Sequence, residues 1–541
     1  MCDTLLRKGD SPSPELFVAK KRPSGIENTS VDITIEAEAP KEVHDIHDVG
    51  KDHYDLMPNG TKVVCFVDND TTNPRNWSKA YKWYITMIVA FTCFCVAFGS
   101  AIVTGDFEGV ARTFDVTLEV SILTICMFVL GFGLGPVVFA PCSELYGRQV
   151  IYVSTLTLAV IFIIPCAVAK NIETLVVCRL IDGIMFSAPM TLVGGTLADI
   201  WNNDERGPAM TFFSAAPFLG PILGPIVGGF IGETIGWRWI YYVYLMYAGL
   251  VLALMVLTIP ETHAPNILRR KAQRLRFMTH DTTFKAPIEL KKVDMKELVV
   301  TYLSRPAELL IREPIVLCVT LYMTVLYGII YMFFFAYPVV FQEGKGYSAG
   351  ITGLCFMGIA AGVVSSLLFA IPINKDYMRR CAAYTERGEK PPPELRLIPM
   401  MIFCWCMPVG LFTFAWTSYP RLVWVGPVLA GFPCGLGFCN LFNSGVNYLV
   451  DVYHEVAASA LAAQTFVRSL WGAGVTLFTL QMYHRLGYQW ASSLIAFLSL
   501  VCCLIPYIFY FWGERIRSYS HFASGKIKKE DIPKEEHTLE L

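Results

Sequence analysis

Twelve long apolar runs constrain this chain more than any other feature of its sequence. Each run has roughly the 20 residues that a helix needs to cross the hydrocarbon core of a bilayer. The first six lie near residues 83–104, 120–141, 150–169, 174–198, 209–231 and 239–259. Six more lie near residues 315–341, 350–371, 398–417, 424–448, 457–482 and 490–512. We therefore expect an all-α membrane protein with twelve transmembrane helices in two six-helix halves.

The composition agrees with a membrane protein and excludes several other classes. Hydrophobic residues make up 54% of the chain and charged residues 16%, whereas soluble proteins average about 25% charged residues. Most of the 17 cysteines lie inside apolar runs, where Cys acts as a small hydrophobic residue rather than as half of a disulfide. Since the net charge is −1 and no long block of one sign occurs, we expect no nucleic-acid partner.

Polar segments divide the chain into five parts. We expect a disordered tail (1–80) without a signal peptide, a first half (81–259), a central loop (260–313), a second half (314–513) and a carboxyl-terminal tail (514–541). The central loop carries 11 Lys and Arg residues and the loop at 372–397 carries 6. Since such loops stay on the cytosolic side, both termini are expected in the cytosol.

The central loop contains a basic stretch, "ILRRKAQRLR". One interpretation is an amphipathic helix that lies on the inner leaflet and is attracted to anionic lipid headgroups. The other is a solvated linker helix. Membrane lipids are partners of the protein in either case.

The chain lacks the usual signs of an enzyme. All nine histidines fall in tails, loops or span ends, and none pairs into a set of metal ligands. The sequence also lacks the G-x-x-x-x-G-K-[ST] phosphate loop. We expect no enzyme activity, no metal and no cofactor, which leaves a secondary transporter driven by an ion gradient as the simplest class.

One span, "AAPFLGPILGPIVGGFIGETIGW" at residues 215–237, is apolar and yet dense in helix-disfavouring residues. Gly220, Gly224, Gly228 and Gly232 recur at every fourth position, and Pro217, Pro221 and Pro225 follow the same spacing. In a bilayer such glycines let a neighbouring backbone approach closely, while prolines bend the helix. We expect a kinked helix with a tight contact surface.

Three motifs of this chain resemble those of a known family. "GPILGPIVGG", with Gly220, Gly224, Pro225, Gly228 and Gly229, resembles the fifth-helix element of proton-coupled antiporters of the major facilitator superfamily. "SELYGRQ" resembles its loop motif between spans two and three, and "RLIDG" its fourth-span motif. With flanks such as "NPRNWSKAYKW" and "PETHAPNILRRKAQRLR", residues 73–525 are similar to the fungal twelve-span drug:proton antiporters, including polyamine and multidrug exporters.

The resemblance implies roles for two of these motifs. The glycine helix is expected where the two halves meet, sealing the pathway against proton leak. In the loop motif, Glu144, Gly147 and Arg148 are expected to form a cytosolic gate in which Glu144 caps a helix of the other half; the alternative is a tight hairpin turn at Gly147. Ala140 and Leu145 depart from the family pattern, so the gate is expected to be weaker or differently wired.

Arg179 and Asp182 are the ionisable pair of the fourth span. Their i, i+3 spacing puts them on one helical face, and Asp182 stands where the family usually has Gln. A charge at a helix centre costs roughly 2.5–3.5 kcal/mol on insertion and is usually functional. We expect Asp182 to carry the coupling proton and Arg179 to tune it; the alternative is a static pair that fixes helix packing.

Candidate cavity residues lie in the second half. Tyr327, Tyr331 and Phe334 crowd span seven with rings that suit drug-like substrates, unless they face lipid. On span ten, Asn443 and Asn447 form a polar stripe with Asp451 that either lines a cavity or ties helices together. Arg468 in span eleven either holds an anionic or carbonyl group of the substrate or pairs with a neighbouring helix.

The resemblance implies a proton-coupled antiporter that exports small molecules by alternating access. Its partners are the substrate and protons, and we expect a monomer in the plasma membrane. Drugs, polyamines, organic acids and secondary metabolites all fit the sequence. The rival function is a proton-coupled uptake symporter or a facilitator of the same fold, for a sugar or organic acid. A receptor is disfavoured because the carboxyl tail is short.

Overall fold

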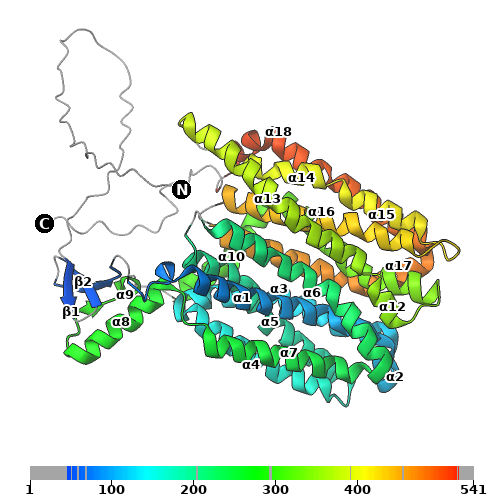
Figure 1. Cartoon of the computed structure of the whole chain (residues 1–541), viewed down its shortest axis with the longest axis horizontal. Coiled ribbons are helices and arrows are strands. Elements are labelled where there is room, and N and C mark those ends of the chain that lie inside the picture. The colour runs from blue at the N-terminus through cyan, green and yellow to red at the C-terminus, as the bar shows by residue number, and fades with distance from the viewer. Residues whose placement is uncertain are drawn as a thin grey trace, which may run out of the picture. The chain divides into compact units, whose positions relative to one another are not determined.

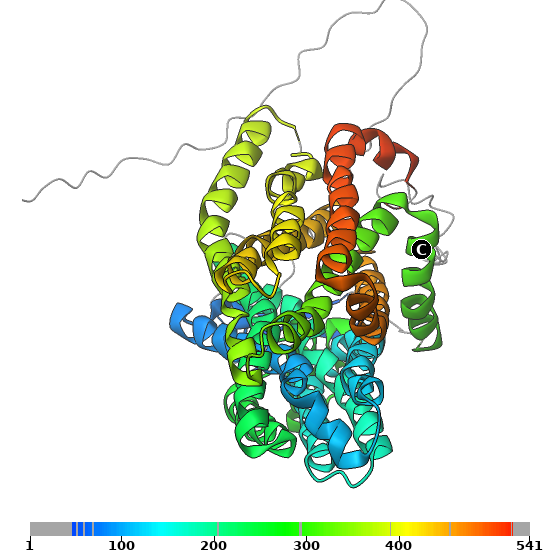
Figure 2. The same ribbon diagram turned by 90° about the vertical axis from the view of Figure 1, so that its right-hand side faces the viewer.

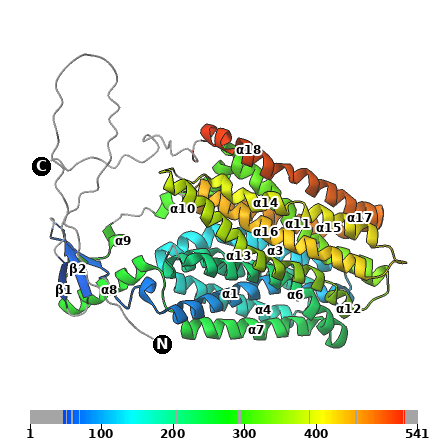
Figure 3. The same ribbon diagram turned by 45° about the horizontal axis from the view of Figure 1, so that its top comes forward.

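The computed structural model describes residues 46–49, 52–57, 60–67, 70–202, 205–290, 295–389, 391–453, 456–520 and 522. Their helices run roughly parallel to one another, and a small sheet lies at one end of them (Figure 1). We call this end, where β1, β2 and α8 lie, the terminal face. The far end, which carries α2 (Figure 1) and α12 (Figure 3), is called the opposite face.

The first half contains six membrane-spanning helices, as predicted. They are α1 (Lys79–Ala101), α3 (Leu118–Tyr146), α4 (Arg148–Ala167), α5 (Ile172–Ile200), α6 (Arg206–Ile235) and α7 (Trp237–Thr258). The turn η2 (Ile102–Asp106) and the short α2 (Phe107–Phe114) extend α1 at the opposite face. Ser78 caps α1 by accepting a hydrogen bond from the Tyr81 amide, so the polar residue before the first apolar run starts the first helix.

The second half repeats this pattern with more interruptions. Its elements are α11 (Pro314–Tyr337) with η3 (Pro338–Glu343), α12 (Ala349–Leu354) with α13 (Met357–Glu386), η4 (Pro393–Arg396) with α14 (Leu397–Phe403) and α15 (Cys406–Thr417), α16 (Val425–Val452), α17 (Ala457–Cys502) and α18 (Leu504–Tyr519). Figure 2 looks nearly along the helices, with the yellow to red helices of this half above the blue and cyan helices of the first.

The last two predicted spans follow one another without a loop, through α17 and α18. For this reason, the described residues give eleven stretches that are long and apolar enough to cross a membrane, the last being Ala457–Tyr519. Gly487, inside α17, has φ 77° and ψ 165°, a conformation open to glycine. The Tyr483 hydroxyl lies 2.9 Å from the Ser492 hydroxyl, although a straight helix would separate them by about 13 Å. The chain therefore reverses at Gly487, and the predicted fold of twelve helices in two halves is confirmed.

A small α/β cap covers part of the terminal face. The strands β1 (Ile46–Val49), β2 (Asp52–Leu56), β3 (Lys62–Cys65) and β4 (Phe284–Lys285) pair in that order, with β3 and β4 parallel. The helices α8 (Ala264–Thr279), α9 (Pro287–Leu290) and α10 (Met295–Arg312) complete the central segment. Val64, Leu268, Ala272, Leu275, Phe284 and Ala286 form the hydrophobic core of the cap.

The cap corrects two expectations. The prediction of a disordered tail through residue 80 is wrong for residues 46–49, 52–56 and 62–65, which are strands; residues 1–45 and 523–541 lie outside the described part. Both interpretations of "ILRRKAQRLR" also missed the sheet on which this helix packs. The apolar face of α8 packs on the sheet, and its basic side chains contact acids, as in Lys271–Asp70 at 2.7 Å and Arg276–Glu289 at 2.9 Å. Pairing between distant segments buries Leu268, Ala272 and Leu275 of α8 inside the cap.

Candidate functional site

Arg179 and Asp182 on α5 form a fully buried ion pair, and each has 0% of its surface exposed. Arg179 Nη1 lies 3.1 Å from Asp182 Oδ2. The guanidinium also donates from Nε to the Thr124 carbonyl of α3 (3.3 Å) and from Nη2 to the Gly99 carbonyl of α1 (3.0 Å). Arg179 therefore ties three helices of the first half together, while Asp182 bonds through one oxygen.

The second carboxylate oxygen, Asp182 Oδ1, is buried and has no hydrogen-bond partner in the described part of the chain. The Tyr241 and Tyr244 hydroxyls of α7 are also buried without such partners. The Arg179 guanidinium lies 5.9 Å from the centre of the Tyr241 ring, and the Tyr244 ring packs against Gly99. These two tyrosines are polar neighbours of the pair that sequence reasoning missed, because "WRWIYYVYLMY" has the character of an apolar span.

The glycines of α6 form the close contact surface that their spacing predicts, and most of it faces α1 and η2. A Cβ at Gly224 would lie 2.9 Å from the Ile102 amide nitrogen and one at Gly220 2.7 Å from the Phe98 nitrogen. At Gly228 a Cβ would overlap the Ile102 carbonyl. The main role of this lattice is thus to join two helices of the same half.

One edge of α6 does meet the second half. A Cβ at Gly229 would lie 2.6 Å from the Ala349 carbonyl of α12, and the Pro225 carbonyl would lie 2.7 Å from a Cβ at Gly353. Near the opposite face, Glu233 accepts a hydrogen bond from the Gly350 amide at 3.0 Å. Of the predicted motif, Gly229 and Pro225 are the residues that contact the other half.

The loop between α3 and α4 is held by an acid from the end of α7. Glu261 is 5% exposed, and its Oε1 accepts from the amides of Arg148 (2.9 Å), Thr262 (3.1 Å) and His263 (3.0 Å). At Gly147 φ is 102°, and a side chain there would overlap Glu261 Oε2. Glu261 therefore ties the first turn of α4 to the segment that leads into the cap.

The Arg148 side chain makes a second set of contacts in this loop. Its Nε lies 3.3 Å from Asp199 Oδ2 near the end of α5, and its Nη1 donates to Ser143 Oγ at 2.7 Å. The Glu144 side chain is exposed, and its backbone carbonyl accepts from Asn266 of α8 at 3.3 Å. Glu261 and Asp199, to which the motifs assign no role, position Arg148. In the sequence, the stretch "PETH" after span six is the feature that would have pointed to Glu261.

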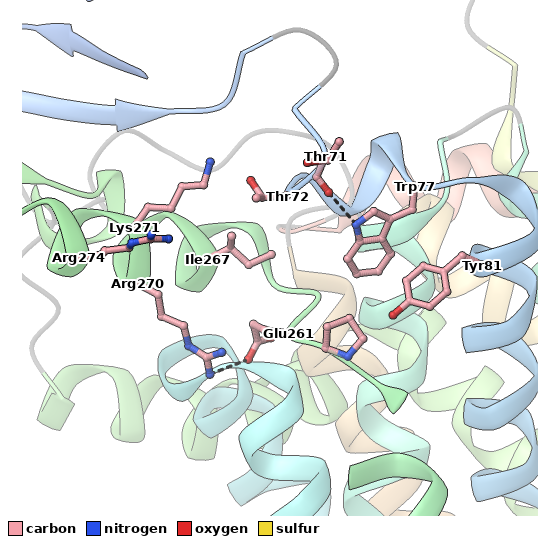
Figure 4. A pocket seen from close by; sticks show the side chains of 10 residues that line it. Thr71, Thr72, Trp77, Tyr81, Glu261, Ile267, Arg270, Lys271 and Arg274 are labelled. Atoms are coloured by element: carbon pink, nitrogen blue, oxygen red, sulfur yellow. Dashed lines mark hydrogen bonds and ion pairs between the residues drawn. The ribbon is translucent and has the colours of Figure 1, made fainter. Parts of the chain in front are cut away.

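A pocket of about 530 Å³ lies between the cap and the start of α1 (Figure 4). It is lined by Thr71, Thr72, Trp77, Tyr81, Pro260, Glu261, Ile267, Arg270, Lys271 and Arg274. Arg270 reaches Glu261 at 3.7 Å, the contact drawn in Figure 4. The pocket is therefore bounded on one side by the acid that holds the loop motif.

The aromatic residues predicted for a substrate cavity lie together on α11. The Tyr327 and Tyr331 hydroxyls are 3.3 Å apart, and the ring centroids of Tyr331 and Phe334 are 5.4 Å apart. Tyr331 and Phe334 are each 3% exposed, so they face the protein interior rather than lipid.

Arg468 of α17 joins this aromatic group. Its guanidinium carbon lies 5.1 Å from the centroid of the Tyr327 ring and 4.9 Å from that of Phe442. Asn443 of α16 donates to Ser214 of α6 across the two halves at 3.3 Å. Asn447 is exposed, and Asp451 accepts from Arg396 at 2.7 Å near the terminal face. The predicted polar stripe on span ten is thus split among three environments.

Comparisons with known proteins place most of the helical region in one family. The family model described as "Major Facilitator Superfamily" matches residues 89–476. The chain is 56% identical over 462 residues to the MFS-type transporter paaT of Penicillium rubens, covering 85% of this chain and 84% of that protein. It is 41% identical to the multidrug transporter mdrA of Aspergillus fumigatus (85% and 76% covered) and 40% identical to the efflux pump FUB11 of Gibberella moniliformis (85% and 77%).

A solved structure supports the same fold. The xylose transporter XylE from E. coli, in a partially occluded inward-open conformation, aligns with a TM-score of 0.58 at 16% identity and covers 80% of this chain and 98% of its own. At this identity the likeness concerns the fold alone. The relatives are transporters and efflux pumps, so the protein described here is a membrane transporter rather than an enzyme.

Proposed function

Because the chain belongs to the major facilitator superfamily, among its fungal transporters and efflux pumps, we propose that it is a proton-coupled antiporter that exports small molecules by alternating access. The observation that carries the proposal is the free oxygen of Asp182, which is fully buried beside Arg179. A half-satisfied carboxylate in a low-dielectric interior is a costly arrangement, and a proton on Oδ1 relieves it.

Protonation of Asp182 would change more than one side chain. A neutral Asp182 attracts the Arg179 guanidinium less strongly, and that guanidinium also holds the carbonyls of Gly99 on α1 and Thr124 on α3. Since α3 packs against α17 of the second half, as in the close approach of Gly133 to Ser469, a shift of Arg179 reaches the boundary between the halves. Arg179 keeps its charge throughout.

We further propose the cellular setting of this transporter. It acts as a monomer in the plasma membrane with both termini in the cytosol, and drugs, polyamines or secondary metabolites are its substrates. The proposed cytosolic gate comprises Glu144, Gly147 and Arg148. The proposed cavity is lined by Tyr327, Tyr331, Phe334, Asn443, Asn447 and Arg468. Antiport is preferred over uptake by symport because the fifth-helix antiporter motif is complete in this sequence.

Transport by purified protein in liposomes tests the proton coupling. Ethidium, 1-naphthalenesulfonate and a neutral azole serve as a cationic, an anionic and a neutral probe, and their flux is measured with and without an imposed pH gradient. Asp182→Asn is expected to lose the response to the gradient down to the level of protein-free vesicles, because it removes the titrating group. Glu173→Gln, which changes an exposed acid in the first turn of the same helix, is expected to keep it. Full gradient-driven flux in Asp182→Asn would contradict the proposal.

A further inference from the structure

Two hydrogen-bond donors in the first third of α17 lack acceptors among the described residues. Arg468 Nε and Gln464 Nε2 are buried without hydrogen-bond partners in the described residues. Across the same part of the chain, the Arg468 guanidinium makes no ion pair, and it has no further interaction beyond its ring contacts. Residues at i and i+4 lie on one helical face, so both side chains leave α17 on the same face.

The Arg468 guanidinium contacts aromatic rings, and no acid of the described ranges pairs with it. The rings of Tyr327 and Phe442 lie about the guanidinium at 5.1 and 4.9 Å, and the Tyr327 hydroxyl reaches Tyr331. Cation–π contacts attract a guanidinium but do not satisfy its N–H groups. A buried cation without an anion is unfavourable, so this arrangement is complete only when something supplies negative charge and acceptor oxygens.

The cluster faces the boundary between the two halves. One turn along α17, a Cβ at Gly472 would touch the Tyr327 ring and lie 3.4 Å from Val129 of α3 in the first half. Beside Phe442, Asn443 donates to Ser214 of α6. Arg468, Tyr327 and Phe442 each keep part of their surface accessible, although they lie in mid-span. A molecule between the halves would therefore meet the guanidinium and both rings.

We propose that Arg468 and Gln464 form the anion-binding subsite of the transported molecule, and that the substrates include aromatic organic monoanions, carboxylates or sulfonates. The proposal rests on the transport function proposed above and adds the chemical class of the substrate. The planar guanidinium fork matches a carboxylate with two parallel hydrogen bonds, Gln464 adds a third donor, and the rings pack against the aromatic body. One guanidinium neutralises one charge. Of the substrate classes proposed above, this subsite therefore disfavours the polyamines, which it would repel.

The charge of such a substrate has a consequence for energy coupling. When a monoanion leaves in exchange for an entering proton, two equivalents of positive charge move inward. An inside-negative membrane potential then drives export together with the pH gradient. Symport of the same anion with one proton would move no net charge.

Binding in nanodiscs without any gradient tests the subsite. Benzoate, benzyl alcohol and benzylammonium share one ring and differ in charge, and their affinities are measured by titration calorimetry at pH 7.5. We expect benzoate to bind at least about tenfold more tightly than the alcohol, and benzylammonium to bind most weakly. Arg468→Gln is expected to remove that tenfold preference. Arg468→Lys keeps the positive charge but not the planar guanidinium, and it is expected to retain only part of the preference. Arg421→Gln, in an exposed loop, serves as the control.

A second variant keeps the test decisive if Arg468→Gln does not fold. Gln464→Met has a similar shape without the donor, and it is expected to weaken benzoate severalfold and benzyl alcohol little. Benzoate affinity unchanged in either folded variant, or benzylammonium as the tightest ligand, would overturn the proposal. Since no gradient is present, failure here leaves proton coupling standing, and failure of the Asp182→Asn test with intact benzoate binding leaves the subsite standing.

Discussion

Gly228 shows how a single hydrogen atom in place of a side chain determines helix packing. A methyl group at this position would overlap the Ile102 carbonyl, whereas one at Gly249 of α7 would meet nothing within 4 Å. We expect Gly228→Ala to lower the free energy of unfolding by about 1–3 kcal/mol, the usual cost of overpacking. Gly249→Ala is expected to be neutral or stabilising by up to about 1 kcal/mol, because Ala favours helix. Thermal unfolding in detergent compares the two, and equal stability would contradict the packing role.

For the loop between α3 and α4, truncating Glu261 and truncating Glu144 are expected to change the free energy of unfolding by different amounts. Truncation in Glu261→Ala leaves the amides of Arg148, Thr262 and His263 without their acceptor, which costs about 1–3 kcal/mol. Glu144→Ala changes an exposed side chain, where a polar interaction contributes about 1 kcal/mol or less, so the unfolding free energy is expected to fall by less than in Glu261→Ala.

Transport by the same two variants separates the proposed Glu144 gate from the loop's anchor. A Glu144→Ala protein with normal stability and impaired export would support the gate. Normal stability together with normal export would show that Glu144 is not part of the gate. The loop would then be held by Glu261 and Asp199.

At the scale of elements, the attachment of α8 depends on a neutral histidine. Burial lowers the pKa of His263 from 6.5 to about 4, and its Nδ1 lies 2.8 Å from Asn266 Nδ2. The detached segment takes up a proton near its ordinary pKa of 6.5, before the docked one does. Docking is therefore fully stable above pH 6.5 and weakens as the pH falls from there toward 4.

Hydrogen exchange of residues 264–279 measures this effect. We expect the protection factors of α8 to fall between pH 7 and pH 5, and His263→Gln to remove most of the change. Protection that is independent of pH in the unmodified protein would contradict the prediction.

The elements that sequence predicts are those specified by local pattern. A span needs about 20 apolar residues in one stretch, so all twelve were visible, including the two joined through Gly487. The cap could not be predicted in this way, because its strands have only 4, 5, 4 and 2 residues and such short segments carry little periodicity. The parallel partners Lys62 and Phe284 are also more than 200 positions apart. The apolar face of α8 could be predicted from its sequence. The strand β3 on which it packs could not, because β3 lies in a segment with the composition of a disordered tail.

The same distinction holds for the site across the whole molecule. The Arg179–Asp182 pair was predicted because both residues lie on one turn of one helix. Their partners Gly99 and Thr124 come from other helices, as does the ring of Phe442, and the anchor Glu261 comes from the segment between α7 and α8. No periodicity reveals such contacts. Asn447 shares the helical face of Asn443 by its spacing but is exposed, and periodicity alone does not show such a difference in burial between two positions of α16.

The direction of proton movement tests the central claim, antiport, most directly. Liposomes that contain the protein and the pH dye pyranine start with equal pH and no potential, and whichever of the three transport probes shows flux is then added outside. Downhill entry of the substrate should expel protons and raise the lumenal pH, and Asp182→Asn should abolish the change while Glu173→Gln retains it. A fall in lumenal pH on substrate entry would identify a symporter and contradict the account.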